Sequence, residues 1–190
     1  MTFEPSKEGN RLVDLITELE GVSRDDFEDR FVSPCLLQVP VEGAFEELAG
    51  GDKQTAAFAK GNAASTMHMS LKDLEGLKRS RNVDQALVHF MPDQEVVVVG
   101  RSPDGDLVLS ATGVSRRHAE FRRSLGNWLL VDLESHNGTF INGNKLEPGH
   151  PTAVLDKQNL WFGSYRALFL YPEQIFNLVT NLRKKARSQQ

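Results

Sequence analysis

The pattern of apolar and polar positions changes near residue 84. After that point, short apolar runs are separated by turn residues, a pattern typical of an antiparallel β-sandwich. Four consecutive valines at 96–99 favour a central strand. Turn signals lie at Asn142-Gly143 and within residues 124–127. The pattern predicts strands over residues 86–90, 95–101, 106–109, 118–123, 128–132, 139–142, 159–162 and 165–171.

The residues before 84 show a mixed and mostly helical pattern. Apolar side chains at helical spacing predict a helix over residues 12–19, and Gly21 marks its end. Ser23 followed by Asp26 resembles a capping box that opens a short helix through Phe31. This part of the chain is therefore predicted to contribute helices rather than further hairpins.

The rest of the N-terminal part carries weaker signals. Residues 35–41 predict a strand, and Pro40 favours an edge position for it because proline cannot donate to a ladder. Helical patterns follow at 45–48, 56–60 and 71–78, and residues 80–82 are typical of a linker. The chain is thus predicted to be mainly β, with a mostly helical extension (1–80), a β-sandwich (84–172) and a C-terminal amphipathic helix with a basic tail (173–190). Whether the extension forms its own domain or packs onto the sandwich is left open.

Composition narrows the class of protein. The 190 residues are 39% hydrophobic, which is enough for a packed core, and the net charge of -4 argues against nucleic acid as the main partner. No apolar run reaches the ~18 residues of a membrane span, and the N-terminus lacks a secretory signal pattern. A single cysteine, Cys35, fits core packing and a reducing, cytoplasmic setting. The four cations of the tail (183–187) favour a solvated helix end, the alternative being contact with nucleic acid or acidic lipid.

Chemistry-bearing residues gather at the tips of three successive predicted turns. Arg101 follows a strand, Ser115 and Arg116 follow the next turn, and Asn137 lies in the third. A cation, a hydroxyl and an amide on neighbouring loops form a site for an anion, with polar groups beside it that can hold a peptide backbone.

Residues 84–172 resemble a forkhead-associated (FHA) domain, a β-sandwich that binds phosphothreonine peptides. The resemblance rests on the motifs Gly100-Arg101, Ser115-Arg116-Arg117-His118, Ser135-His136-Asn137-Gly138-Thr139 and Asn142-Gly143. It implies that Arg101 and Ser115 bind the phosphate, that Arg116 supplies a second and more variable phosphate contact, and that Asn137 grips the main chain of the ligand.

Other residues of these loops receive supporting roles. His136 departs from the residue types common in the family, and as an imidazole it offers a pH-dependent donor near the phosphate or simply faces solvent. Gly113 is a candidate for shaping a pocket for the threonine methyl group. The resemblance assigns His118 a structural role, and Gly100 and Gly138 support the backbone. Ser115, His118 and Asp132 resemble a Ser/His/Asp set in composition alone, without a nucleophile elbow.

The sequence favours a non-enzymatic adaptor that binds a threonine-phosphorylated partner of a Ser/Thr kinase pathway. The alternative is a phosphate-independent scaffold that uses the sandwich and the N-terminal extension as interfaces. No P-loop, dinucleotide fingerprint or metal-ligand cluster is present, so no cofactor, metal or catalytic residue is predicted. A further hypothesis is self-regulation, in which a phosphate on Thr17, Thr55 or Thr66 folds back into the protein's own site. Thr17 lies on a predicted helix, which is the wrong conformation for an extended ligand.

Overall fold

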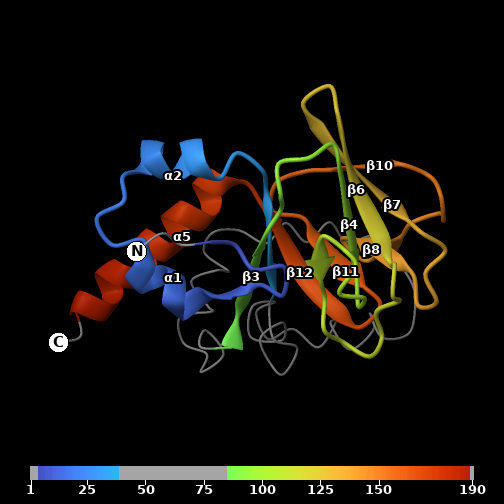
Figure 1. Cartoon of the computed structure of the whole chain (residues 1–190), viewed down its shortest axis with the longest axis horizontal. Helices are drawn as coiled ribbons and strands as arrows, with labels where there is room; N and C mark the ends of the chain where they lie inside the picture. Colours follow the sequence, from blue (N-terminus) through green and yellow to red (C-terminus); the bar gives the residue numbers. More distant parts are fainter. Residues whose placement is uncertain (1–3, 39–84, 189–190) are drawn as a thin grey trace, which may run out of the picture.

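A computed structural model describes residues 4–38 and 85–188 and shows two packed sheets with helices at one side (Figure 1). The strand order is β1-β3-β2-β12-β11-β8-β9 in the seven-stranded sheet and β10-β7-β6-β4-β5 in the five-stranded sheet. The strands are β1 Asn10–Arg11, β2 Cys35–Gln38, β3 Leu87–Phe90, β4 Val96–Gly100, β5 Leu107–Val108, β6 Ala119–Ser124, β7 Asn127–Asp132, β8 Thr139–Ile141, β9 Asn144–Lys145, β10 Thr152–Val154, β11 Asn159–Phe162 and β12 Tyr165–Leu170. The helices of the described part are α1 Leu12–Glu18, α2 Arg24–Arg30 and α5 Pro172–Ser188. The predicted β-sandwich with a C-terminal helix is confirmed.

Two tight turns set the register of two hairpins. β6 and β7 pair up to Ser124 and Asn127, so the loop is Leu125-Gly126, with both residues at positive φ (48° and 78°). Asn142-Gly143, with φ of 50° and 82°, joins β8 to β9 in the same way. Such turns match the right-handed twist of the strands they connect. β9 and β10 were not predicted, because two or three residues are too few to show an alternating pattern.

The apolar side chains form two cores, one on each face of the seven-stranded sheet. The last four residues of β12 are buried, because Ala167 and Phe169 face the other sheet while Leu168 and Leu170 face the helices. The helices fill the second core from their apolar stripes, as the spacing at 12–19 predicts. Figure 1 shows α1, α2 and α5 together on the same side of the sandwich.

Capping and ion pairs hold these helices. Ser23 caps α2, since its Oγ accepts a hydrogen bond of 3.1 Å from the Asp26 backbone N–H, as the sequence predicts. The guanidinium of Arg183 on α5 donates to the carbonyl of Ile16 on α1, at 3.0 and 2.6 Å. Arg187 forms an ion pair with Glu20. Part of the basic tail therefore binds the end of α1, and the prediction of a solvated helix end is wrong for Arg183.

The position of β2 corrects one prediction. Cys35–Gln38 is not an edge strand but an interior one, paired with β3 on one side and with β12 on the other. Residues 4–38 thus pack onto the sandwich rather than standing apart. Cys35, Leu36 and Leu37 are all buried, which suits an interior strand with a core on each of its faces. Cys35 is buried, as predicted, and burial raises the pKa of its thiol. The predicted helices at 45–48, 56–60 and 71–78 and the linker at 80–82 lie outside the described residues.

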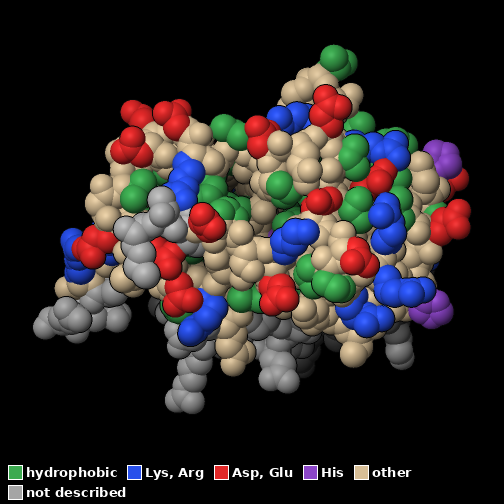
Figure 2. Space-filling view, viewed as in Figure 1, with side chains coloured by type: hydrophobic (Ala, Val, Ile, Leu, Met, Phe, Trp, Pro, Cys, Tyr) green, Lys and Arg blue, Asp and Glu red, His purple; other side chains and the backbone are tan. Residues whose placement is uncertain are grey.

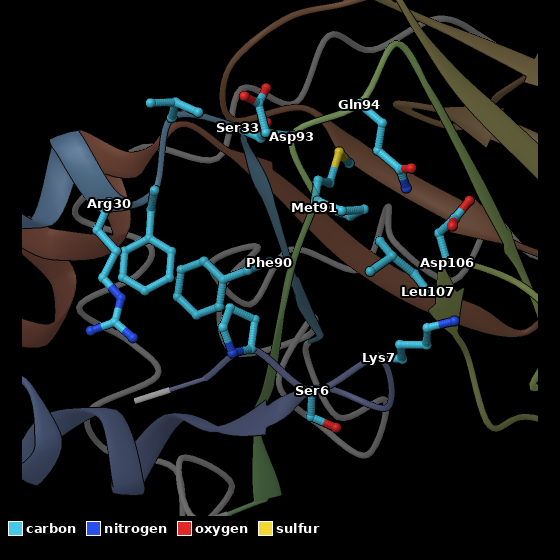
Figure 3. A pocket seen from close by; sticks show the side chains of 14 residues that line it. Ser6, Lys7, Arg30, Ser33, Phe90, Met91, Asp93, Gln94, Asp106 and Leu107 are labelled. Atoms are coloured by element: carbon cyan, nitrogen blue, oxygen red, sulfur yellow. The ribbon is translucent and has the colours of Figure 1, made fainter. Parts of the chain in front are cut away.

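The first described residues extend along the five-stranded sheet. The carbonyl of Lys7 accepts a hydrogen bond of 2.8 Å from Val108 of β5, and Lys7 Nζ lies 3.2 Å from the carbonyl oxygen of Gly105. A groove of about 450 Å³ separates this segment from α2 and β3, and Figure 3 shows Lys7 near Asp106 at its rim. The N-terminal segment therefore supports the loop that follows β4.

Candidate functional site

Hydrogen bonds tie four loops together at one end of the sandwich. The Arg101 backbone N–H donates to the carbonyl of Ser115 (2.9 Å), which joins the β4–β5 loop to the β5–β6 loop. The β7–β8 loop joins them through Asn137, and the β11–β12 turn joins through Gly163, whose N–H donates to the carbonyl of Gly138 (3.0 Å). The predicted residues, which span residues 100–138, thus lie in one place.

Arg101 stands at the end of β4 with its side chain exposed. Its Nε donates to the carbonyl of Val114 at 3.3 Å, which orients the guanidinium and leaves its terminal nitrogens for an anion. Gly100 makes this arrangement possible, because a Cβ at that position would lie 2.1 Å from the carbonyl oxygen of Arg116. The absence of a side chain lets β4 approach the Arg116 backbone closely.

Ser115 and His136 are connected across two loops. Ser115 Oγ accepts a hydrogen bond of 3.0 Å from the backbone N–H of His136, so its own hydroxyl hydrogen is free to donate to a ligand. The imidazole of His136 is exposed, and its backbone, not its ring, makes this contact. Arg116 is exposed beside Ser115 and forms no ion pair with the described residues.

Asn137 is oriented by the loop that carries Gly113. Its Nδ2 donates to the carbonyl of Gly113 at 2.8 Å, which leaves its side-chain oxygen and one amide hydrogen for an extended peptide. Two glycines allow the close packing here. A Cβ at Gly113 would lie 2.5 Å from Ser164 Oγ, and a Cβ at Gly163 would lie 2.1 Å from the carbonyl oxygen of Gly113. Gly113 therefore positions the anchor of Asn137, and sequence reasoning missed Gly163.

His118 is buried below these loops and links two of them. Its Nδ1 accepts a hydrogen bond of 3.0 Å from the backbone N–H of Ser115, and its Nε2 lies 3.2 Å from the carbonyl oxygen of Gly138. This geometry fixes the neutral tautomer with the proton on Nε2. Burial lowers the pKa of His118, although the Gly138 carbonyl and the Asp132 charge oppose the shift. The imidazole contacts Ser115 through the backbone rather than the hydroxyl, so no nucleophile–base pair exists between them.

Asp132 organises the β7–β8 turn, a role that sequence reasoning missed. Its carboxylate is buried and accepts hydrogen bonds from the Ser135 backbone N–H (3.0 Å), from Ser135 Oγ (2.6 Å) and from Thr139 Oγ1 (2.5 Å). An aspartate three residues before a serine at a strand end is the available sequence signal, because such side chains commonly bind the backbone of the following turn. The turn that carries Asn137 therefore rests on a buried charge.

Four exposed cations lie on and beside these loops, together with two exposed carboxylates, Asp104 and Glu134. Arg101, Arg116, Arg117 and Lys145 are exposed, and none of the four forms an ion pair with the described residues. Figure 2 shows Lys and Arg side chains over the sandwich, with acidic side chains among them, and both kinds of charge on the helical side as well. No group of His, Cys, Asp or Glu in residues 4–38 and 85–188 has the arrangement of a metal site. None of the helices in those ranges is long and apolar enough to cross a membrane.

Comparison with known proteins finds FHA-domain relatives of this chain. The family model of the FHA domain matches residues 97–163. The oxoglutarate dehydrogenase inhibitor of Corynebacterium jeikeium is 41% identical over 81 residues, which are 43% of this chain and only about half (54%) of that protein. The yeast Dun1 FHA domain, solved with a doubly phosphorylated peptide derived from Rad53, matches with a TM-score of 0.45 and 20% identity over 74% of this chain and 76% of that chain.

Two glycogen accumulation regulators align with most of the chain. GarA of Mycobacterium tuberculosis is 38% identical over 169 residues, covering 88% of this chain and 89% of that protein. GarA of Mycolicibacterium smegmatis is 40% identical over 157 residues, covering 83% of this chain and 84% of that protein. These matches extend well beyond the FHA domain into the N-terminal part. The chain therefore belongs to the family of FHA-domain proteins that includes GarA.

Proposed function

We propose that this protein is a phosphothreonine-dependent adaptor whose four joined loops bind a partner phosphorylated by a Ser/Thr kinase. The proposal rests on one observation: hydrogen bonds between their loops bring Arg101, Ser115 and Asn137 together. A phosphothreonine carries roughly -1.5 to -2 charges and three acceptor oxygens, which match an oriented guanidinium and a free hydroxyl.

The residues divide the recognition between them. Arg101 supplies fixed, permanently charged donors to the phosphate, and Ser115 adds a short hydroxyl donor. Arg116 adds charge from the rim, and the exposed imidazole of His136 adds a further hydrogen-bond donor. Asn137 pairs with the main chain of the ligand, which makes that contact tolerant of the ligand sequence.

The chemistry of the partner follows from the relatives. Several are named oxoglutarate dehydrogenase inhibitors, and others are named glycogen accumulation regulators. We propose that this chain likewise binds a metabolic enzyme, with an oxoglutarate dehydrogenase as the first candidate, and acts without catalysis of its own. We propose a cytoplasmic location to match such a partner.

Peptide binding tests the proposal. Phosphothreonine, phosphoserine and unphosphorylated peptide libraries are presented to the full chain and to Arg101→Ala. We expect selective capture of phosphothreonine by the wild type and a loss of about ten- to a hundredfold in affinity in the variant, since charge-assisted hydrogen bonds contribute roughly 1.5–3 kcal/mol. Arg24→Ala is the matched control, because Arg24 pairs with Glu28 on α2, outside the site.

Two results would contradict the assignment. Unchanged peptide binding by a folded Arg101→Ala protein would show that Arg101 does not bind the phosphate. Equal capture of a cellular partner before and after phosphatase treatment would replace the adaptor with a phosphate-independent scaffold.

A further inference from the structure

We propose that Lys145 makes this site select phosphothreonine peptides that carry a second negative charge beside the phosphothreonine, on the side of the ligand that passes Asn137. The inference rests on the proposed function and names the class of ligand for that same site. None of the recognition motifs includes Lys145, which lies on β9, one strand beyond the loop that carries Asn137.

The side chain of Lys145 lies directly against the β7–β8 loop. A Cβ at Gly138 would lie 2.6 Å from Lys145 Cε, 3.4 Å from Lys145 Nζ and 3.4 Å from Phe140 Cε2. Phe140 is also the cross-strand partner of Lys145. The aliphatic stem therefore passes over Gly138, which brings the ammonium group close to the β7–β8 loop.

Gly138 is what admits this cation to the rim of the site. Its φ of +80° and the close approach of Lys145 both require a residue without a side chain. Since Gly138 directly follows Asn137, the ammonium lies next to the residue proposed to hold the main chain of the ligand. An extended peptide that pairs with Asn137 passes within reach of Lys145 Nζ.

The charge of Lys145 is available to a ligand. Lys145 is exposed and forms no hydrogen bond or ion pair with the described residues. The carboxylate of Glu147, two residues further along, forms no ion pair with Lys145 and lies 3.7 Å from His150 Nδ1. The phosphate is proposed to neutralise Arg101 and Arg116, so Lys145 remains for an aspartate, a glutamate or a second phosphorylated residue in the flanking sequence.

The test uses synthetic phosphothreonine peptides with neutral flanks and a single aspartate placed at each flanking position in turn. The full chain and Lys145→Met, which keeps the stem that packs on Gly138, are compared by calorimetry. Lys184→Met, at the exposed end of α5, is the control for net charge. We expect the wild type and Lys184→Met to prefer aspartate at one position by about two- to fivefold, which is typical of an exposed ion pair.

Lys145→Met should lose that preference while its affinity for the neutral phosphothreonine peptide stays within about twofold of wild type. Lys145→Glu should instead favour a lysine at the same position, a reversal that no loss of folding produces. The wild-type preference should weaken when the salt concentration rises from about 0.05 to 0.3 M.

The possible failures are distinguishable. An aspartate preference that persists unchanged in Lys145→Met, or that is absent from the wild type, overturns the role of Lys145 and leaves phosphothreonine binding intact. Failure of the wild type to bind the neutral phosphothreonine peptide overturns the proposed function itself.

Discussion

Asp132 accepts a hydrogen bond of 2.5 Å from the hydroxyl of Thr139 across the β7–β8 turn. The same carboxylate accepts two further bonds from Ser135, so a buried charge closes the loop that presents Asn137. A buried carboxylate is stable only when such donors surround it, because an unpaired charge in the interior is strongly unfavourable. The geometry of the ligand site thus depends on a residue that is itself buried.

Asp132→Asn should lower the free energy of unfolding by about 2–4 kcal/mol. The amide keeps the shape of the carboxylate but loses the charge-assisted acceptors, and its NH2 group faces donors. We also expect weaker phosphothreonine binding, because the Asn137 loop loses its support. Urea denaturation and peptide titration measure the two effects.

Asp104→Asn is the control for this substitution. Asp104 is exposed, and its carboxylate accepts a hydrogen bond of 3.0 Å from Ser102 Oγ. Its change in stability should stay within about 0.5 kcal/mol. An equal loss of stability in the two variants would contradict the organising role of Asp132.

The sequence predicts the sandwich and the site because both depend on local signals. Each of the predicted strands follows its own apolar run, and Arg101, Ser115 and Asn137 each stand beside turn residues that place them at loop tips. Their proximity in space follows from the pairing of β4 and β7 with β6, because Val99 and Asp132, at the ends of those two strands, both lie opposite Ala119 at the start of β6.

The features that the sequence did not predict, the interior position of β2 and the role of Gly163, depend on tertiary contacts. β2 lies between two strands, with Leu36 in the core between the sheets and Cys35 and Leu37 in the core under the helices. Its continuous apolar run is the pattern of a strand buried on both faces, but Pro40 favoured an edge. Gly163 likewise carries no local signal, since its importance comes from the Gly113 carbonyl of a loop about fifty residues earlier.

Gly163→Ala should weaken phosphothreonine binding by about tenfold or more. The new Cβ would lie 2.1 Å from the carbonyl oxygen of Gly113 and 3.2 Å from Asn137 Cβ, so the acceptor that orients Asn137 must move. Loss of one ligand hydrogen bond of about 1.5 kcal/mol corresponds to roughly tenfold in affinity. Calorimetric titration with a phosphothreonine peptide measures the change.

Gly126→Ala separates this contact from backbone strain. Both glycines have positive φ (59° and 78°), so alanine is strained at either position by about 1–2 kcal/mol. A Cβ at Gly126 meets no atom within 4 Å, so the Gly126→Ala protein should lose stability and keep its affinity. Normal affinity in Gly163→Ala would show that Asn137 does not need the Gly113 carbonyl.

Buried His89 should make the fold less stable in mild acid. Its Nε2 lies 2.6 Å from the Tyr165 hydroxyl, and burial lowers its pKa from 6.5 to about 4, although a hydrogen bond to the Lys7 backbone opposes the shift. Below pH 6.5 the unfolded chain binds a proton at this position and the folded protein does not. The contribution of His89 to the free energy of unfolding is therefore fully present above about pH 6.5. It falls as the pH is lowered and levels off below about pH 4.

The contribution of His89 amounts to about 2 kcal/mol lost between pH 7 and pH 5. Urea denaturation of the wild type and of His89→Gln at the two pH values measures it, because the difference between pH values cancels any constant cost of the substitution. Burial also lowers the pKa of His118, so the His89→Gln protein should still lose part of its stability between pH 7 and pH 5. His150→Gln, at an exposed position, should keep the full wild-type slope. If His89→Gln loses as much stability as the wild type between pH 7 and pH 5, protonation of His89 is not the cause.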